Sequence, residues 1–454
     1  MKQKLYRWLG CILSAFILFS SVGMTALATD ENVEMSEEAQ YELEMQQVYA
    51  KPIESNARQG WPQGPMIYGE SAIVVDMQTG AVLYEKGADE RRYPASITKV
   101  LTALIAIENS SMDDLVTFSE ASIQSLESGY AHLAMRPGEV ITMKDALHAL
   151  LLASANEVGY AIGETIAGSH EKFIEMMNER AKELGCKNSN FVNTNGMFNE
   201  NHYTTPRDMA LIAMEAYKHP EFREVESALQ YTIPATNLEP EPRTFQQKHK
   251  MRKVGNKFYD ERCVGGKTGY TEKASNTLIT YMESEGRSLV CVDMCSRKDI
   301  FPDTKAMCDY AFSQFKNVNI SEFDKEHKIV SEDSQKSVTL PINVEADQIK
   351  SKEEGENVNY YYNDTLIGSA RLDKTEEVKK AAEKKKAKVE LEKKQKKQEK
   401  EKADRYAHIE AAIIIIIIIA LIIIGAYVFS AKNKEQRKKR NYYRWKRIRR
   451  IFKR

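Results

Sequence analysis

The chain has 454 residues, of which 42% are hydrophobic and 29% charged, as expected for a globular protein of two or three domains. Its net charge of zero hides an asymmetry, because residues 431–454 hold thirteen Lys or Arg and one acid, a net +12, which leaves −12 for the remainder. Five cysteines follow Cys11, an odd number without zinc-like spacing, which argues against a disulfide framework and against a zinc module.

The N-terminus has the form of a signal peptide. Three basic residues precede an apolar stretch from about Leu9 to Val22, and Ala26-Leu27-Ala28 has the small-x-small form that signal peptidase accepts. We therefore expect residues 1–28 to be cleaved, with an uncleaved membrane anchor as the alternative. Residues 29–58 are acidic and polar, which predicts a flexible leader, with ordered structure beginning near Trp61.

Residues 59–316 combine strand and helix patterns. Apolar runs at both ends predict strands, and the segments between them have helical periodicity. The expected strands are 71–76, 81–84, 277–282 and 288–294, and the expected helices are 97–109, 143–152, 156–167, 170–184, 206–218 and 304–315. Strands at both ends with helices between them indicate an α/β (α+β) domain, in which one sheet is formed by the two chain ends and flanked by helices.

The C-terminal third consists of consecutive segments that differ in composition. Residues 317–372 are strand-like and polar, which predicts a small β-rich domain with strands near 337–340 and 359–362. Residues 373–408 are dominated by Lys, Glu, Ala and Gln, which favours a charged helical stalk.

An uncharged segment follows the stalk. Twenty residues without a charge, from Ala411 to Ser430, span about 30 Å as a helix, so we expect one transmembrane helix at 409–430. The basic residues 431–454 follow directly, which predicts a cytoplasmic tail on an anionic leaflet, with the N-terminal part outside the cell. Nucleic acid is not the expected partner of this tail.

The segment Ser96-Ile97-Thr98-Lys99 opens a predicted helix. Backbone N–H groups of a first helical turn lack intrahelical partners and are suited to binding an oxyanion. Lys99 lies one turn on, within reach of the Ser96 hydroxyl, and is a possible base if its pKa is lowered. Taken alone, the pattern is much more typical of an ordinary helix start with a surface lysine.

Two further motifs follow. Ser154-Ala155-Asn156 interrupts a buried apolar segment; Ser154 is suited to relay a proton near Lys99, and Asn156 to hold Lys99 and a substrate amide. Gly265 to Thr271 contains Lys267-Thr268-Gly269-Tyr270, which suits an edge strand that a peptide can approach, with Lys267 opposite a carboxylate. A phosphate-binding loop is excluded, because Glu261 stands where that motif requires glycine.

Ser-x-x-Lys, Ser-x-Asn and Lys-Thr-Gly in this order form the motif set of penicillin-binding proteins and serine β-lactamases. Residues 58–316 resemble the catalytic domain of the low-molecular-mass D-alanyl-D-alanine carboxypeptidases. The segments that add to this resemblance are Val75 to Gly80, Phe191 to Gly196, His202 to Thr205 with Asp208, and His249-Lys250-Met251. The resemblance implies a β-lactamase/transpeptidase-like fold; the transmembrane span in place of an amphipathic anchor is a departure from the family.

The resemblance also implies a mechanism. Ser96 attacks the carbonyl between the last two D-alanines of a peptidoglycan stem pentapeptide, Lys99 accepts its proton, and Ser154 passes a proton to the leaving D-alanine. The backbone N–H groups of Ser96 and Tyr270 form the oxyanion hole, while Lys267 and Thr268 hold the terminal carboxylate. β-Lactams are expected to acylate Ser96. No metal, nucleotide or other cofactor is implied, and the oligomeric state is not predicted.

Three alternatives remain open. A class A β-lactamase needs a Glu-x-x-Leu-Asn segment, to which Glu226 to Gln230 is a poor match. A DD-endopeptidase would use the same site on cross-linked peptides. A non-catalytic wall-binding protein has no need of three intact motifs.

Overall fold

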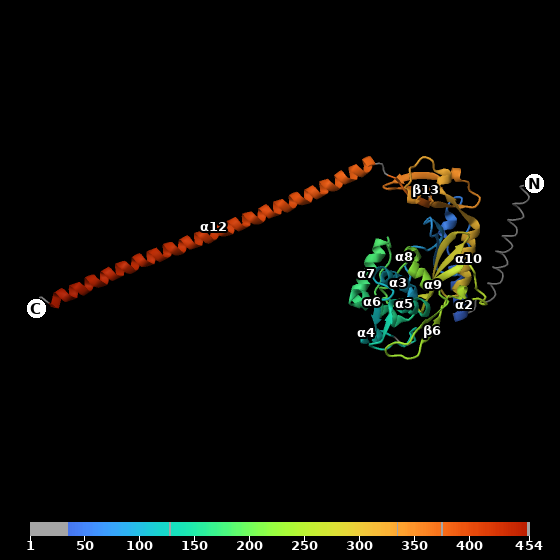
Figure 1. Cartoon of the computed structure of the whole chain (residues 1–454), viewed down its shortest axis with the longest axis horizontal. Coiled ribbons are helices and arrows are strands. Elements are labelled where there is room, and N and C mark those ends of the chain that lie inside the picture. Colours follow the sequence, from blue (N-terminus) through green and yellow to red (C-terminus); the bar gives the residue numbers. More distant parts are fainter. Residues whose placement is uncertain (1–34, 127–128, 334, 374–375, 452–454) are drawn as a thin grey trace, which may run out of the picture. The chain divides into compact units, whose positions relative to one another are not determined.

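A computed structural model describes residues 35–126, 129–333, 335–373 and 376–451 of the chain (Figure 1). The chain divides into two compact units, Met1–Leu372 and Asp373–Arg454. The expected signal peptide at residues 1–28 lies outside the described residues.

One antiparallel five-stranded sheet organises the first unit. Its strands are β1 (Ser71–Asp76), β2 (Val82–Lys86), β7 (Cys263–Thr271), β8 (Ser275–Ser284) and β9 (Arg287–Ser296), in the order β2-β1-β9-β8-β7. Strand β1 pairs with β9, with Val74 opposite Cys291, so segments more than 200 residues apart in sequence lie side by side. The sheet predicted from the two chain ends is confirmed, and β7 lies at its edge.

The alternation of side chains along the strands builds two cores, one on each face of the sheet. Ile73 and Val75 belong to a core shared with the main group of helices, whereas Ala72 and Val74 belong to a second core shared with α10 (Ile300–Gln314). Figure 1 shows α10 on the opposite side of the sheet from that group. The main group consists of α3 (Lys99–Asn109), α5 (Met143–His148), α6 (Asn156–Ala167), α7 (His170–Glu183), α8 (Pro206–Lys218) and α9 (Pro220–Ser227).

Several short elements connect these. The helical turns are η1 (Glu54–Ala57), η2 (Ala95–Thr98), α4 (Glu120–Gln124), the π-helical turn η3 (Ala149–Ala153) and η4 (Lys250–Arg252). Two hairpins pair β3 (Leu115–Thr117) with β4 (Val140–Thr142) and β5 (Gln230–Ile233) with β6 (Arg243–Gln246). The helix predicted over 143–152 is thus α5 followed by a π-helical turn, and α9, β5 and β6 were not predicted.

A small β-rich part follows α10, as the sequence indicates. Val338, Leu340, Tyr360 and Ile367 are fully buried in it. It consists of β10 (Phe315–Asn319), α11 (Ile320–Phe323), η5 (Ser331–Asp333), β11 (Ser337–Pro341), η6 (Ala346–Gln348), β12 (Lys350–Glu354), β13 (Asn357–Tyr362) and β14 (Thr365–Arg371). Strands β12, β13 and β14 form one antiparallel sheet, and β10 pairs with β11.

The prediction of a flexible leader over residues 29–58 is wrong for the part that the structure describes, residues 35–58. Helix α2 (Glu37–Tyr49) begins at a Ser36 cap, and its Met45 side chain is buried. The buried ammonium of Lys86 donates to the carbonyl of Val48 over 2.8 Å and thereby holds the end of this helix. The acidic surface composition of α2 concealed these few buried contacts from the sequence analysis.

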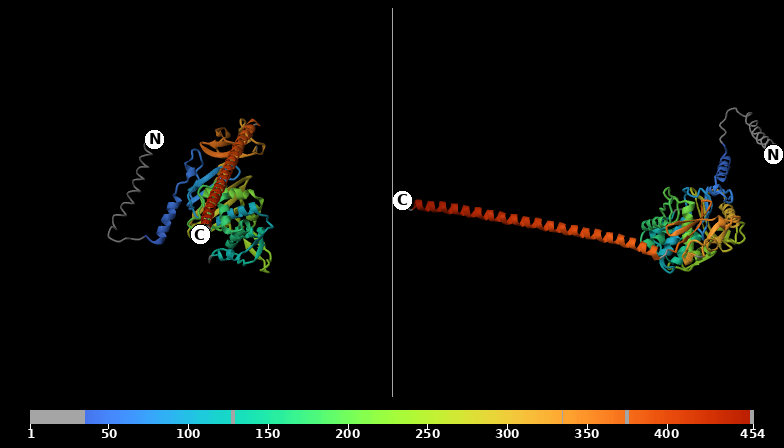
Figure 2. Two further views of the ribbon diagram at one scale, coloured as in Figure 1. Left: turned by 90° about the vertical axis from the view of Figure 1, so that its left-hand side faces the viewer. Right: turned by 90° about the horizontal axis from the view of Figure 1, so that it is seen from above.

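The second unit contains one helix, α12 (Glu376–Ile451), which Figure 2 shows without a break. Its stretch Ile413–Arg449 is, by length and composition, long and apolar enough to include a membrane span. The isoleucines from Ile413 to Ile419 are exposed, as a lipid-facing surface requires. Over the residues that the structure describes from Glu376 to Ile451, the segments predicted as stalk, span and tail form a single helix.

Candidate active site

Ser96 lies in a tight turn with unusual backbone geometry. The turn η2 leads directly into α3, and Ala95 within it has a left-handed φ of +49°. Such a conformation costs a non-glycine residue about 1–3 kcal/mol. The Thr98 hydroxyl donates to the Ala95 carbonyl over 2.9 Å, and Gly196 packs so closely that a Cβ there would lie 1.7 Å from the same oxygen. These contacts hold Ser96 in one orientation.

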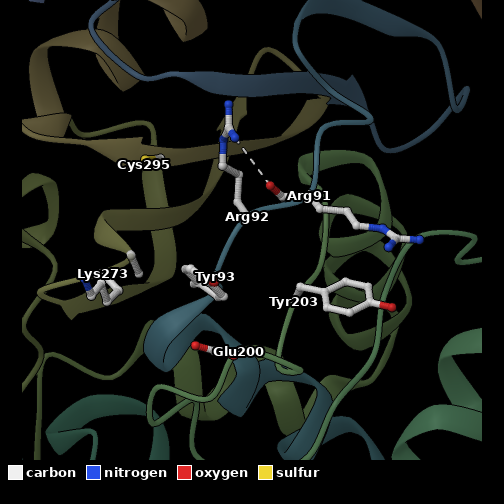
Figure 3. A pocket seen from close by; sticks show the side chains of 8 residues that line it. Arg91, Arg92, Tyr93, Glu200, Tyr203, Lys273 and Cys295 are labelled. Carbon is white, nitrogen blue, oxygen red and sulfur yellow. Dashed lines mark hydrogen bonds between the residues drawn. The ribbon is translucent and has the colours of Figure 1, made fainter. Parts of the chain in front are cut away.

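The chain just before Ser96 is anchored as well (Figure 3). The backbone of Arg92 exchanges hydrogen bonds of 2.8 and 2.9 Å with Thr204, and its guanidinium donates to the Arg91 carbonyl and pairs with Glu70. The Arg91 guanidinium lies 4.5 Å from the ring centre of Tyr203. A cavity of about 440 Å³ adjoins this segment. These contacts therefore fix the chain segment that leads into the Ser96 turn.

Lys99 is fully buried, and its ammonium nitrogen makes three polar contacts. Nζ lies 3.0 Å from Ser96 Oγ, 2.8 Å from Asn156 Oδ1 and 2.6 Å from the carbonyl oxygen of Asn195. The first and second predicted motifs are thus brought together at one atom. Asn195 is a contact that the sequence analysis did not single out, although it lies in the segment Phe191 to Gly196 that carried the resemblance.

The surroundings of Lys99 disfavour its charged form. Burial lowers the pKa of Lys99 well below its usual range, and the nearby cations Lys267 and Lys248 lower it further. The carboxylate of Glu157 acts in the opposite direction. A neutral amine beside a serine hydroxyl is able to accept its proton.

Ser154 and Asn156 flank the junction of η3 and α6. Ser154 has a left-handed φ of +63°, which ends the π-helical turn and directs its hydroxyl to Lys267, whose Nζ lies 3.0 Å from Ser154 Oγ. Its described hydrogen bond is therefore with Lys267, whereas the sequence analysis expected it near Lys99. Asn156 also donates from Nδ2 to the Ala131 carbonyl over 3.0 Å, which fixes the loop above the site.

The third motif lies on edge strand β7, next to the Ser96 turn. A Cβ on Gly269 would lie 2.8 Å from the backbone nitrogen of Ser96, so only glycine lets the two backbones approach this closely. Gly266 has φ +149°, and a Cβ there would lie 2.2 Å from the Ile279 carbonyl oxygen. Gly269 therefore sets the distance between β7 and the serine, whereas Gly266 permits the close pairing of β7 with β8.

Lys267 is buried, and its Nζ lies 2.8 Å from the carbonyl oxygen of Thr268 in addition to Ser154 Oγ. Burial lowers the pKa of Lys267 to about 7, the neighbouring Lys248 lowers it too, and Glu226 opposes both. Lys99 of the first motif and Lys267 of the third motif are thus both buried and both have lowered pKa values.

The three motifs line one cleft of about 340 Å³. Tyr270 stands at its edge with 65% of its surface exposed. The lining includes the residues of the motifs except the two lysines beneath them, together with a loop and a cationic rim: Ser96, Gly129, Tyr130, Ala131, Ser154, Asn156, Lys248, Lys250, Thr268, Gly269, Tyr270, Asn276, Asp299, Ile300 and Phe301. Lys248 was not predicted; the only available signal was its place beside His249-Lys250-Met251.

Two further residues of the resemblance support the cleft from behind. His202 Nδ1 accepts the N–H of Val192 over 3.0 Å, so its Nε2 carries the proton and donates to Thr98. Burial lowers the pKa of His202 to about 3. The Asp208 carboxylate accepts N–H groups of Lys187 and Asn188 at the start of the loop that leads to Asn195.

One cluster of possible metal ligands, Glu108, Glu215 and His219, lies outside the cleft. Arg180 pairs with Glu108 at 2.5 Å and with Glu215 at 3.4 Å. The Arg180 guanidinium already neutralises the two carboxylates, so we propose no metal ion at this cluster.

Comparisons with known proteins agree with this geometry. Residues 57–297 match the family described as "Peptidase_S11: D-alanyl-D-alanine carboxypeptidase". The chain is 34% identical over 255 residues to the D-alanyl-D-alanine carboxypeptidase DacF of Bacillus subtilis, covering 54% of this chain and 62% of that relative's length. It therefore spans less than two thirds of this curated relative.

Solved structures show the same fold. The crystal structure of a Streptomyces DD-transpeptidase matches with a TM-score of 0.51 at 26% identity, covering 56% of this chain and all of that one. Penicillin binding protein 6B of Escherichia coli matches with a TM-score of 0.57 at 22% identity, covering 72% of this chain and all of that one. The predicted fold class is confirmed by these similarities.

Proposed function

Because this chain belongs to the D-alanyl-D-alanine carboxypeptidase family of serine peptidases, we propose that it removes the terminal D-alanine from peptidoglycan stem pentapeptides through an acyl-enzyme on Ser96. The observation that carries the proposal is the contact of 3.0 Å between the fully buried Lys99 amine and the Ser96 hydroxyl. Burial lowers the pKa of this lysine well below its usual range, which favours the neutral amine that can act as a base.

In the acylation step, Ser96 Oγ attacks the carbonyl carbon of the penultimate D-alanine while its proton passes to Lys99 Nζ. The developing oxyanion accepts hydrogen bonds from the backbone N–H groups of Ser96 and Tyr270, and the close approach that Gly269 permits supports this assignment. Asn156, which contacts Lys99 over 2.8 Å, holds the base in line and orients the substrate amide.

The leaving D-alanine needs a proton on its nitrogen and a cation for its carboxylate. Ser154 supplies the route for the proton, and Lys267 and Thr268 bind the carboxylate, which also excludes substrates with a blocked C-terminus. The hydrogen bond of 3.0 Å between Lys267 and Ser154 supports a link between the two tasks. Water then attacks the acyl-enzyme, with Lys99 again taking a proton. β-Lactams, which offer a carbonyl and a carboxylate in similar positions, inhibit by acylating Ser96.

We further infer that the protein is held in the cell membrane by α12, with the catalytic domain on the wall side and the C-terminus in the cytoplasm. The apolar stretch that begins at Ile413 supports one crossing, and the cations after Ser430 favour the inner side of the membrane. A protease cleavage site placed after Arg449 tests the orientation: cutting in intact cells without lysis would contradict it.

The test of the activity is release of D-alanine from a diacylated tripeptide ending in D-Ala-D-Ala by the full chain in detergent. We expect release by the native protein and by Ser227→Ala, an exposed serine outside the cleft, and none by Ser96→Ala. No release by the native protein would refute the proposal.

A class A β-lactamase is disfavoured by the position of Glu226. This carboxylate lies behind β7, with 1% of the residue exposed, and does not line the cleft where a deacylating water would bind. Release of a bound penicillin over many minutes supports the carboxypeptidase, whereas rapid turnover would support the β-lactamase. The endopeptidase alternative is tested by adding a cross-linked peptide dimer to the same assay.

A further inference from the structure

Glu226 is a buried acid that the proposed mechanism leaves unused. It lies near the end of α9, and its Oε2 accepts the N–H of Gly266 over 2.9 Å, one residue before Lys267. A Cβ on Gly265 would lie 3.1 Å from the Cβ of Glu226, so the helix and β7 are in direct contact there. The carboxyl group of Glu226 therefore holds the backbone of β7 and lies behind the cleft, next to Lys267 along the strand.

The second oxygen of this carboxylate has no hydrogen-bond partner. Oε1 of Glu226 is buried without one in the described part of the chain. The nearby Arg252 donates from its two terminal nitrogens to the carbonyls of Cys263 and Ser227, over 2.6 and 2.8 Å, and its buried Nε has no described partner. An ionised carboxylate in such a position is stabilised by cations near it and in turn stabilises them.

Lys267 makes no described hydrogen bond to an acidic group. Its two described hydrogen bonds go to neutral oxygens, of Ser154 and Thr268. Burial and the charge of Lys248 both lower the pKa of Lys267, and Glu226 is the group that raises it. Burial raises the pKa of Glu226, which Gly266, Lys267 and Arg252 oppose.

The chemistry demands opposite charge states of two buried lysines. Lys99 must be neutral to accept a proton from Ser96, whereas Lys267 must be an ammonium to hold a carboxylate. Both are buried, and burial disfavours the ammonium form of each. The charged and titratable groups that interact with Lys267 or Glu226 come from several neighbouring elements; they are Lys99, Lys248, His249, Arg252 and Tyr281.

We propose that Glu226 is a positioning residue that keeps Lys267 protonated while Lys99 remains neutral, and that it holds β7 at its distance from Ser96 through Gly266. The inference rests on the proposed function, because it assigns Lys267 to a substrate carboxylate. Glu226 is assigned no contact with substrate.

The test measures the second-order rate of acylation by a fluorescent penicillin against pH, with the full chain in detergent. In Glu226→Gln the acceptor for Gly266 is retained and the charge is lost, so we expect the alkaline limb of the profile to move about one pH unit or more toward acid. At pH 8 this corresponds to a loss of about tenfold in rate. Glu226→Asp, which keeps the charge, should restore part of the shift.

Glu139→Gln is the matched control, because Glu139 is a fully buried acid paired with Arg243 and does not line the cleft. It should lower the melting temperature without moving the profile. An unmoved profile in a folded Glu226→Gln overturns the inference and leaves the proposed function intact. If the native protein neither reacts with penicillin nor releases D-alanine, the proposed function is refuted, and so is the role assigned to Glu226.

Discussion

Gly269→Ala is expected to lower the catalytic rate far more than it lowers the stability of the fold. The added Cβ would lie 2.3 Å from Thr277 Oγ1 and 2.8 Å from the backbone nitrogen of Ser96. Ordinary contacts of carbon are about 3.5–4.0 Å, so β7 and the Ser96 turn must separate by roughly 1 Å. Overpacking of this kind costs about 1–3 kcal/mol of stability.

The same displacement acts much more strongly on the reaction. A misplacement of about 1 Å at reacting groups costs about 10²-fold in rate. We therefore expect kcat/KM for D-alanine release and the rate of penicillin acylation to fall together by about 10²-fold, since both use the same oxyanion site. The melting temperature, measured in parallel by scanning fluorimetry, should fall by only a few degrees.

Gly168→Ala provides the control. Gly168 ends α6 with φ +77° and has no atom within 4 Å of a Cβ built on it, so alanine there strains the backbone without a clash. This variant should lose about 1 kcal/mol of stability and keep its activity within about twofold. If Gly269→Ala retains nearly full activity, the close approach of β7 to Ser96 is not what positions the oxyanion site.

Three further outcomes are expected. Acylation should slow as pH rises through about 7, because Lys267 then loses the proton that its carboxylate ligand requires; a rate that stays constant to pH 10 would contradict this. Burial lowers the pKa of His202 and of His249 to about 3, below the unfolded value near 6.5, so the unfolded chain binds the extra protons. Stability should therefore fall as pH drops from about 6.5 toward 3, by up to about 1.4 kcal/mol per pH unit for each histidine; a melting temperature independent of pH would refute it. Glu157→Ala removes the acceptor of the Leu133 N–H and should lower kcat/KM about tenfold by freeing the loop above Asn156, whereas Glu157→Gln, which keeps an acceptor, should not.

The sheet was predictable because its strands are short apolar runs whose periodicity is visible in the sequence. The pairing of β1 with β9 follows once strands are expected at both ends of the domain. Helix α2 was missed because its burial depends on single residues, Met45 among them, within an acidic surface sequence. The π-helical turn before Ser154 was missed because helical periodicity does not distinguish it from a continuing α-helix.

The motif residues of the candidate site could be picked out from the sequence, whereas their burial and their contacts across the fold could not. Ser96, Ser154 and Lys267 were proposed from the sequence because their spacing along the chain is a recognisable pattern. The contacts of Asn195, Glu157 and Glu226 were not predicted because they depend on burial and on residues far apart in sequence, 96 residues in the case of Lys99 and Asn195. The hydrogen bond of Ser154 to Lys267 likewise depends on a single left-handed residue.

The central claim is that Ser96 forms the acyl-enzyme, and peptide mass spectrometry of the penicillin-treated full chain tests it most directly. We expect the penicilloyl adduct on the peptide that contains Ser96 and no adduct in Ser96→Ala, whose melting temperature should stay close to that of the native protein. An adduct on Ser154, or an adduct that persists in Ser96→Ala, would contradict the account.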